Sequence, residues 1–431
     1  MTQPIRTSAR IAVVGAGIAG LSSALYLSRL RQAVTIFERF PEAQPVGSGL
    51  MLQPTGMSVL YDLGLLDSVL QLGQPISGLL GHDARSGRRI LDVTYRGGRF
   101  GLGVNRAALF QVLFDAVLAA GIPIETAHEI SRANATEARV WLLDGKGQRI
   151  NDAFDLLVDA AGVRSPLRDA NDPDAVLRPF AYGAFRATLR LPDTGFIFDR
   201  LEQRYQHASV MIGVMPAGQI TRASPQTCAF FWSLKTAHVQ AVRDAGLPAW
   251  KARVHELWPA TTPLLDQITS LSDLAVAEYA HVTLRRPYNG RIIHVGDSAH
   301  ATSPQLGQGA NMALLDARAL AHAIAQAGSL SDIGPTYARS RRLHVRFFQL
   351  ASRALTPFYQ SDGRLIPWLR DGLVATVAKV PPVPTILSAL VSGTLVDPFK
   401  RIGLTEADWA RLGSSQTQRV LAAEGPIAAM E

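Results

Sequence analysis

The sequence predicts an α/β fold: a parallel sheet flanked by helices, a mostly antiparallel sheet inserted into it, and a helical C-terminal region. Two apolar runs near the start, residues 11–14 and 34–37, have the β-branched composition of buried parallel strands. Between them, glycines are followed by leucines and alanines at helical spacing. From about residue 180 to residue 280 the pattern changes to alternating, aromatic-bearing segments, which indicates antiparallel strands.

Composition limits what kind of protein this is. The chain has 431 residues, of which 47% are hydrophobic, so it can build two or three packed domains and is not disordered. Its single cysteine, Cys228, excludes an intrachain disulfide and favours a cytoplasmic location. The net charge of +8 suits an anionic cofactor or substrate, whereas no zinc spacing or RNA-binding signature is present. We therefore expect neither a metal site nor nucleic-acid binding.

The glycines after the first strand have the spacing of a Rossmann-type dinucleotide fingerprint. Gly15 permits the tight turn, Gly17 lets a pyrophosphate approach the backbone, and Gly20 lets the helix pack closely on the strand. The N-terminus of that helix offers free N–H groups to the phosphates. The second strand ends at Glu38, where the fingerprint places an acid for the ribose hydroxyls. Together these residues predict a bound dinucleotide rather than a chance glycine turn.

Local patterns place the remaining elements of the first half. Residues 81–95 form two runs around Ser86-Gly87, which predicts a hairpin. Residues 105–120 carry apolar side chains at helical spacing, which predicts an amphipathic helix. The other elements expected here are a helical stretch at residues 57–70 and short strands at residues 123–128, 138–143, 148–154 and 156–158.

The second half begins with the inserted sheet and then returns to the first pattern. The basic stretch at residues 339–346 is expected to be a solvated helix face. The apolar stretch at residues 373–396 contains Lys379 and three prolines, so it predicts core packing or a surface contact rather than a transmembrane helix. The predicted elements are strands at residues 182–189, 205–215, 227–234 and 291–295, and helices near residues 237–245, 249–258, 309–327 and 336–355.

A second motif, residues 294–311, follows the last buried strand. Asp297 ends that strand and can accept hydrogen bonds from polyol hydroxyls, which suits the ribityl chain of a flavin. The helix that begins near Gly309 directs its dipole at whatever lies before it, and a flavin ring becomes negative at its pyrimidine edge on reduction. The alternative is that Asp297 only caps a helix and the glycines only form turns.

A third motif, residues 155–168, completes the pattern. All three stretches resemble the single-component FAD-dependent aromatic hydroxylases, the family of p-hydroxybenzoate hydroxylase and salicylate hydroxylase, over roughly residues 10–350. The resemblance implies a Rossmann-type FAD-binding domain at residues 1–80, 96–178 and 281–335, and no separate nicotinamide domain. A substrate domain would comprise residues 81–95 and 179–280, and a C-terminal helical region residues 336–431.

The resemblance also implies which residues bind the cofactor. Arg106 matches an arginine of the family that lies at the start of a helix and contacts FAD. Arg39, which follows Glu38, is included among the cofactor-binding residues. The implied FAD-binding residues are Gly15, Gly17, Gly20, Glu38, Arg39, Arg106, Asp297, Pro304, Gly307, Gly309, Ala310 and Asn311.

One position departs from the family. The third motif of these hydroxylases has an aspartate, credited with a part in FAD and NAD(P)H binding, where this chain has Ala161. Asp159 lies two residues earlier, and we expect it to share a strand face with position 161 if the strand extends that far. The departure puts efficient reduction by NAD(P)H in question more than FAD binding.

The function implied is that of an FAD-dependent monooxygenase. NAD(P)H would reduce FAD, O2 would form a flavin hydroperoxide, and an aromatic or other electron-rich small molecule would be oxygenated. No catalytic residue is assigned, and a monomer or a homodimer is expected. The alternatives are an FAD-dependent oxidoreductase without oxygen insertion, and a flavin-binding protein with impaired reduction. The residues predicted to line a substrate pocket are Phe185, Tyr205, His207, Met211, Phe231 and Pro304.

Overall fold

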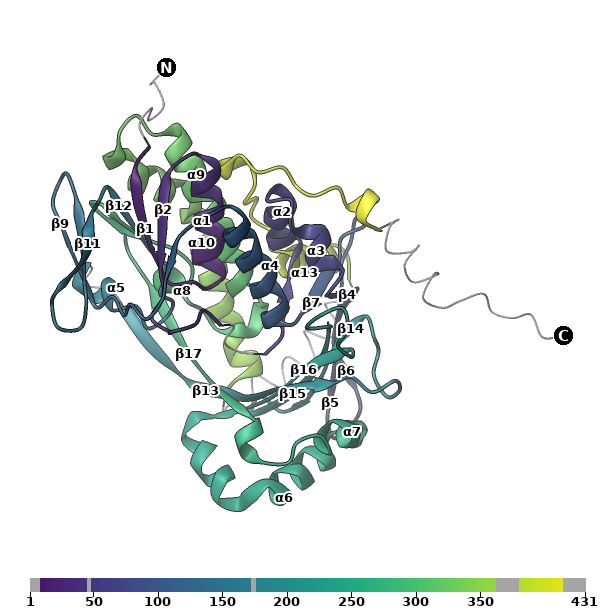
Figure 1. The fold of residues 1–431 in the computed structure, drawn as a ribbon. Coiled ribbons are helices and arrows are strands. Elements are labelled where there is room, and N and C mark those ends of the chain that lie inside the picture. The colour runs from purple at the N-terminus through teal and green to yellow at the C-terminus, as the bar shows by residue number, and fades with distance from the viewer. Residues whose placement is uncertain (1–7, 45–47, 172–175, 362–379, 414–431) are drawn as a thin grey trace.

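The computed structural model describes residues 8–44, 48–171, 176–361 and 380–413. A six-stranded sheet forms the upper part of the molecule in Figure 1, and a seven-stranded sheet lies below it. The α/β class predicted from the sequence is therefore confirmed. No helix in these four stretches is long and apolar enough to span a membrane.

The six-stranded sheet is mostly parallel and carries the first motif. Its central strand, β1 (Arg10–Val14), pairs in parallel with β2 (Ala33–Phe37) on one side and with β12 (Leu156–Asp159) on the other. Beyond β12 lie β19 (Ile292–His294) and β18 (Tyr288–Asn289), and beyond β2 lies β8 (Ile124–Glu125). The four predicted parallel strands are thus present and adjacent, which brings the segments after them to one edge of the sheet.

Alternation along β1 explains how this sheet is covered on both faces. Ile11 and Val13 point into the main core with the helices, whereas Ala12 and Val14 point into a separate core under a three-stranded sheet. The helices on the first face are α1 (Ile18–Arg29), α4 (Arg106–Ala119), α9 (Gly309–Gln326) and α10 (Leu330–Tyr359). The strands over the second face are β9 (Arg132–Ala135), β10 (Val140–Leu143) and β11 (Arg149–Phe154).

The seven-stranded sheet is antiparallel except between β14 and β5. Two of its strands come from the predicted hairpin, β5 (Gly78–Asp83) and β6 (Arg89–Thr94). The others are β13 (Val176–Arg190), β14 (Arg200–Gln206), β15 (Val210–Gly218), β16 (Thr227–Lys235) and β17 (Ala275–Thr283). Helix α6 (Val239–Leu257) packs against one face, where Trp250 lies in a second large core.

Several predicted elements have different bounds in the structure. Residues 205–215 were expected to be one strand but form the hairpin of β14 and β15, and residues 57–70 form two helices, α2 (Pro54–Asp62) and α3 (Leu66–Leu70). The two helices predicted near residues 237–245 and 249–258 agree with the structure, where Gly246, with a φ of 83° and a ψ of 166°, interrupts the helical backbone within α6. The apolar stretch at residues 373–396 lies partly outside the described residues, which include α13 (Val383–Ser392).

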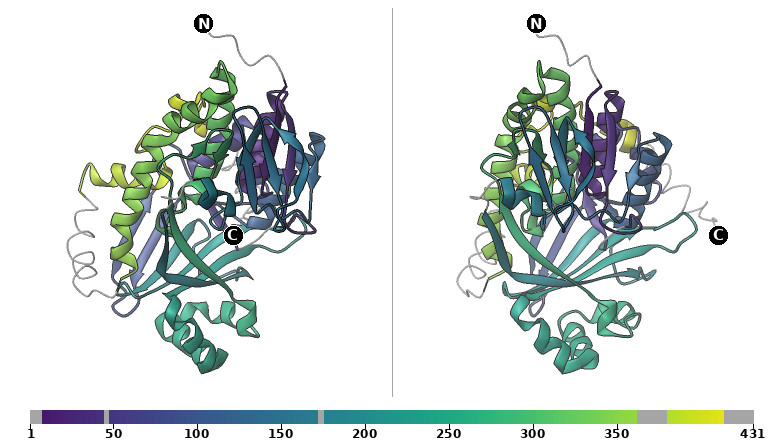
Figure 2. Two further views of the ribbon diagram at one scale, coloured as in Figure 1. Left: turned by 90° about the vertical axis from the view of Figure 1, so that its left-hand side faces the viewer. Right: turned by 60° about the vertical axis from the view of Figure 1, so that its left-hand side comes forward.

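Helix α10 connects the two sheets. It starts beside β18 and runs along the molecule to the second sheet, as Figure 2 shows. At its far end the ring of Tyr359 lies 5.5 Å from that of Tyr205 on β14. The helix is therefore placed to support both sides of any site between the sheets.

Candidate functional site

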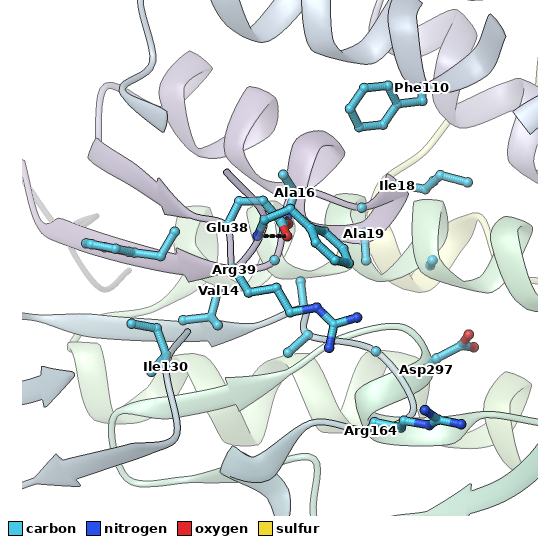
Figure 3. Close-up of a pocket in the computed structure, with 18 of the residues that line it drawn as sticks. Val14, Ala16, Ile18, Ala19, Glu38, Arg39, Phe110, Ile130, Arg164 and Asp297 are labelled. Carbon is cyan, nitrogen blue, oxygen red and sulfur yellow. Dashed lines mark hydrogen bonds between the residues drawn. The ribbon is translucent and has the colours of Figure 1, made fainter. Parts of the chain in front are cut away.

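A pocket of about 470 Å³ lies at the carboxyl ends of β1, β2 and β12. Its walls also include the starts of α4, α8 (Asp297–His300) and α9. In Figure 3, Arg39, Arg164 and Asp297 surround the same space, together with Ala16 and Ile18 of the glycine loop. Ligands of open α/β sheets bind at this edge, outside the carboxyl ends of the strands. Of the predicted cofactor residues, Gly15, Gly17, Glu38, Arg39, Arg106, Asp297, Gly309 and Ala310 line the pocket.

The three glycines of the first motif differ in their surroundings. Gly15 has a φ of +103°, and a Cβ there would lie 2.6 Å from the carbonyl oxygen of Ala160, so no other residue fits the turn. A Cβ on Gly17 would meet nothing within 4 Å, since this residue caps α1 and faces the pocket. Gly20 lies below the pocket, where a Cβ would collide with the backbone of Gly15.

The side chain of Glu38 links the glycine loop after β1 to the segment after β2. Its Oε2 accepts a hydrogen bond from the Ala16 N–H at 2.8 Å, drawn as the dashed line in Figure 3, and its Oε1 accepts one from the Phe40 N–H at 3.1 Å. The guanidinium of Arg39 lies over the ring of Phe40 at 4.6 Å. Glu38 thus fixes the glycine loop and borders the pocket at the same time.

Arg106 and Asp297 lie at the other end of the pocket. Asn105 caps α4 by accepting a hydrogen bond from the Ala107 N–H at 2.9 Å, which sets Arg106 as the first residue of the helix. Within the described residues, the buried Nε of Arg106 has no hydrogen-bond partner. Burial, and then the charge of Arg186, lower the pKa of Arg106, while Asp297 opposes the shift. A buried cation beside one exposed carboxylate is a good place for an anionic or polar ligand.

The loop after Asp297 is held by Asn311. Its Oδ1 accepts from the Gln53 N–H at 2.8 Å, and its Nδ2 donates to the Gly307 carbonyl at 2.9 Å and the Met51 carbonyl at 3.3 Å. Asn311, Gly307, Pro304 and Gly20 do not line the pocket. They shape the loop and the helix beneath it instead.

A buried ionic network supports the same loop, and the sequence did not reveal it. Asp316 on α9 accepts from His300 Nε2 at 2.5 Å, from Arg341 Nε at 2.7 Å and from the Gly296 N–H at 2.7 Å. Burial raises the pKa of Asp316, but His300 and Arg341 outweigh burial and hold that pKa well below its usual range. Arg341 is 2% exposed, so the expectation of a solvated basic face is wrong at this residue. Its guanidinium on α10 instead pairs with Asp316 on α9.

The third motif places its acid away from the pocket. Asp159 is fully buried, and its Oδ2 accepts from His294 Nδ1 at 2.6 Å and from Ser165 Oγ at 2.7 Å, while its Oδ1 accepts from the Ala161 N–H at 3.0 Å. Ala161 lines the pocket and Asp159 does not. The condition under which Asp159 would share a strand face with position 161 is not met, because β12 ends at Asp159.

The residues predicted to line a substrate pocket do not all come together. Tyr205, Met211 and Phe231 lie in one apolar cluster with Tyr359 of α10. Phe185 points to the opposite face of the sheet, where it packs against Trp250, because neighbouring positions on β13 alternate between faces. His207 is exposed in the turn between β14 and β15, with a φ of 53°, because the predicted single strand is a hairpin. We correct the prediction for Phe185 and His207.

Pro304 lies on the loop after α8. Hydrogen bonds between this loop and α10 hold the loop in place. The hydroxyl of Ser303 lies 2.6 Å from Ser352 Oγ and 3.0 Å from Thr356 Oγ1. These contacts join residues far apart in the sequence, so local patterns gave no sign of them.

Comparisons with known proteins agree with this geometry. The model of a family described as "FAD binding domain" matches residues 8–346. The chain is 27% identical over 388 residues to 2-heptyl-3-hydroxy-4(1H)-quinolone synthase of Pseudomonas aeruginosa, covering 85% of this chain and 94% of that protein. It is 27% identical over 389 residues to 3-amino-4-hydroxybenzoate 2-monooxygenase of Streptomyces cremeus, covering 82% of this chain and 89% of that protein.

A solved structure shares the fold. That of Klebsiella pneumoniae HpxO complexed with FAD and uric acid superposes with a TM-score of 0.75 at 20% sequence identity, covering 90% of this chain and 98% of that one. The family model spans most of the chain, and the resemblance predicted from the sequence is confirmed. The chain belongs to the family of FAD-binding-domain proteins that includes the FAD-dependent aromatic hydroxylases.

Proposed function

We propose that this chain is an FAD-dependent monooxygenase that uses NAD(P)H and O2 to oxygenate an aromatic or other electron-rich small molecule. Membership of the FAD-binding family supports the cofactor, and relatives named monooxygenases support the reaction. Bound FAD supplies the redox chemistry and the activation of O2. The chain itself must bind the cofactor, orient the substrate and exclude water.

One observation carries the assignment of the pocket to FAD. The buried Nε of Arg106 lacks an acceptor within the described residues, and Asp297 stands exposed at the same end of the pocket. A buried donor without a partner costs about 1–3 kcal/mol, which a bound acceptor would offset. A carboxylate and a guanidinium facing one space suit the hydroxyls of a ribityl chain and the polar edge of a flavin.

The remaining residues then take these proposed places. The backbone at Gly15 and Gly17, with the N-terminus of α1, would hold the pyrophosphate. Glu38 and Arg39 would meet the adenosine ribose, and Asp297 the ribityl chain. Gly309 and Ala310 begin α9, whose positive dipole end would favour negative charge on the ring. Pro304, Gly307 and Asn311 would shape the loop beside that ring, and Gly20 the packing beneath the pyrophosphate.

Two alternatives to the monooxygenase remain, and Ala161 bears on the second of them. An alanine at the pocket wall cannot make the hydrogen bonds of the aspartate found there in the aromatic hydroxylases. An FAD-dependent oxidoreductase would oxidise or reduce its substrate without oxygen insertion, whereas a flavin-binding protein without turnover would have Ala161 as the trace of a lost reductase function. Substrate-dependent NAD(P)H consumption, with transfer of isotopically labelled oxygen into the product, distinguishes the monooxygenase from both.

The domain division predicted from the sequence is also part of the proposal. Strands β5 and β6 extend the sheet formed by β13–β17, which supports grouping residues 81–95 with residues 179–280. A cytoplasmic location and a monomer or homodimer complete the proposal.

The test of the pocket assignment is the pair Arg106→Ala and Arg106→Lys. The parent protein should purify with non-covalent FAD, and Arg106→Ala should bind FAD about tenfold or more weakly, because a hydrogen bond to a charged donor is lost. Arg106→Lys keeps the charge but not the Nε position, so it should restore only part of the affinity. Equal affinity in all three proteins would contradict the assignment, and a parent protein that binds no FAD would contradict the function.

A further inference from the structure

We infer that the outward side of α10 is a docking surface for a membrane that contains anionic lipids. The inference concerns where the protein binds rather than what it oxygenates, so it goes beyond the proposed function and stands independently of it. It accounts for two features that the FAD pocket leaves unused: the basic stretch at residues 339–346 and the described part of the apolar stretch at residues 373–396.

The exposed side of α10 consists of arginines and apolar residues. The exposed residues of this helix after Asp332, which we call the outer face, are Arg339, Arg342, Leu343, Arg346, Leu350, Arg353 and Ala354. At about 3.6 residues per turn they fall on one side of the helix, opposite the buried Arg341, His344 and Phe348. Leu350 is 63% exposed and Leu343 50% exposed, so the face is not simply a solvated charged one.

The positive charge of the outer face is uncompensated. Within the described residues, none of its four arginines forms an ion pair, and the face itself contains no acid. Arg353 donates to Thr283 Oγ1 at 2.9 Å, and Arg339 lies 3.5 Å from Thr336 Oγ1, so these partners are neutral. Cations beside exposed leucines are complementary to lipid phosphates above an apolar layer.

The apolar residues lie on the side of the outer face that is nearer to α13. Around the helix, Leu343 and the half-buried Phe347 fall between the arginines and His344, which donates to the Gly393 carbonyl just after α13. Helix α13 and the residues beside it expose three more large apolar side chains, those of Val380, Ile386 and Leu395. Both helices lie along the same edge of the molecule in the left view of Figure 2. Apolar groups from two segments therefore border the row of arginines.

A lipid surface fits these residues better than the other possible partners. A symmetric contact with a second copy would bring the same four arginines together, which is unfavourable. A nucleic acid would match the arginines but would leave Leu343 and Leu350 against phosphates and water. At a bilayer the guanidinium groups remain among the headgroups while the leucines enter the apolar layer, so both kinds of side chain find a suitable environment.

The experiment measures co-sedimentation of the purified protein with vesicles of phosphatidylcholine alone or with about one quarter phosphatidylglycerol. The parent should bind only the anionic vesicles, and the binding should weaken as salt is added. Arg342→Gln combined with Arg346→Gln should weaken binding about 25-fold, because each arginine near an anionic surface contributes about fivefold. Lys146→Gln combined with Arg243→Gln removes the same charge from exposed positions outside α10 and should bind like the parent.

A second pair of variants tests the apolar part of the face. Leu350→Gln should weaken binding to the anionic vesicles about tenfold, because a leucine no longer enters the apolar layer. Leu118→Gln, at a 53% exposed position on α4, should bind like the parent. The FAD content should be the same in all these proteins, because none of the substituted residues lines the pocket. Leu343→Gln repeats the test if Leu350→Gln lowers the FAD content.

Several results would overturn the inference. One is a parent that binds neither kind of vesicle or binds both equally, and another is unchanged binding in the double arginine variant. A dimer that Leu350→Gln dissociates, without vesicle binding, would assign the face to a second copy. Binding of duplex DNA that is equally strong in Leu350→Gln and the parent, without vesicle binding, would assign it to a nucleic acid. Absence of FAD from a parent that binds anionic vesicles would refute the proposed function and leave this inference standing.

Discussion

The acidic side chains of the three motifs differ in whether other groups of the chain already bind them. The carboxylates of Glu38 and Asp159 both accept hydrogen bonds from the chain itself, the first from backbone N–H groups and the second from His294, Ser165 and the Ala161 N–H. Asp297, by contrast, is exposed and its carboxylate accepts no hydrogen bond within the described residues. A carboxylate that the fold does not need is the one most available to a ligand.

Asp297→Ala should therefore weaken FAD binding and leave the fold largely intact. Hydrogen bonds from polyol hydroxyls to a charged acceptor contribute about 1.5–3 kcal/mol, or roughly tenfold to a hundredfold in affinity. Titration of the apoprotein with FAD, followed by flavin fluorescence, measures the change. Asp297→Asn keeps the shape and one acceptor, so its loss should be smaller. Unchanged affinity in Asp297→Ala would mean that the residue only begins α8.

Ala161→Asp should speed the reduction of bound flavin by NAD(P)H by about tenfold, the equivalent of about 1.4 kcal/mol. Position 161 lines the pocket and Asp159 is occupied elsewhere, so the new carboxylate supplies hydrogen bonds that the parent lacks. Anaerobic stopped-flow spectroscopy gives the rate, and Ala161→Asn controls for size. Asp159→Ala should instead lower stability, because His294 loses a buried partner. A reduction rate that is the same in Ala161→Asp and the parent would exclude this segment from the reductive step.

Among the elements, the contacts that α10 makes with α9 and with the Pro304 loop were the hardest to predict from the sequence. The helical period of α10 is visible in the sequence, but Arg341 and Ser352 reach α9 and the Pro304 loop only through tertiary packing. The hairpin of β14 and β15 was missed for a different reason. Its turn contains no glycine or proline, and His207 takes the left-handed conformation that usually favours glycine.

The contact between α10 and α13 makes stability depend on pH. His344 Nε2 donates to the Gly393 carbonyl at 3.0 Å, and its Nδ1 lies 3.3 Å from Arg341 Nη1, so the ring is neutral. Burial, and then the charge of Arg341, lower the pKa of His344 to about 3. An unfolded histidine has a pKa of about 6.5 and binds a proton more readily. The stabilisation is complete above about pH 6.5 and is lost as the pH falls toward the folded value.

His344→Gln should therefore flatten the acid side of the stability profile. Glutamine can donate to the Gly393 carbonyl and accept from Arg341 but does not titrate. Between about pH 6.5 and pH 5 the parent should lose about 2 kcal/mol more of its free energy of unfolding than the variant. Urea unfolding across this range measures the difference. His238→Gln, at an exposed position, should follow the parent, and parallel profiles for all three proteins would contradict the neutral buried state.

At the scale of the whole molecule, the features predicted correctly from the sequence are those that short stretches of residues determine. The glycine turn, the parallel strands and the residues after them follow from spacing and apolar runs, and they meet at one edge of the sheet. The side of the second sheet that is directed at the first sheet could not be predicted, because alternation separates two faces without indicating which one is directed inward. Phe185 was misplaced for this reason.

The walls of the pocket come from segments that are far apart in the chain, from Val14 to Ala313. A ligand that binds all of these segments binds the folded chain and not the unfolded one, so FAD should stabilise the entire domain. At a free FAD concentration one hundred times the dissociation constant, the free energy of unfolding should rise by about 2.7 kcal/mol. Urea unfolding of the apoprotein at increasing FAD concentrations measures this, with FMN as the control, because it lacks the adenosine half that Glu38 and the glycine loop are proposed to hold. Asp297→Ala should show the same rise displaced to higher FAD concentrations, since its binding is weaker and its fold is intact. Stability that does not change with FAD, or that rises equally with FMN, would mean that the glycine loop and Glu38 do not hold the cofactor.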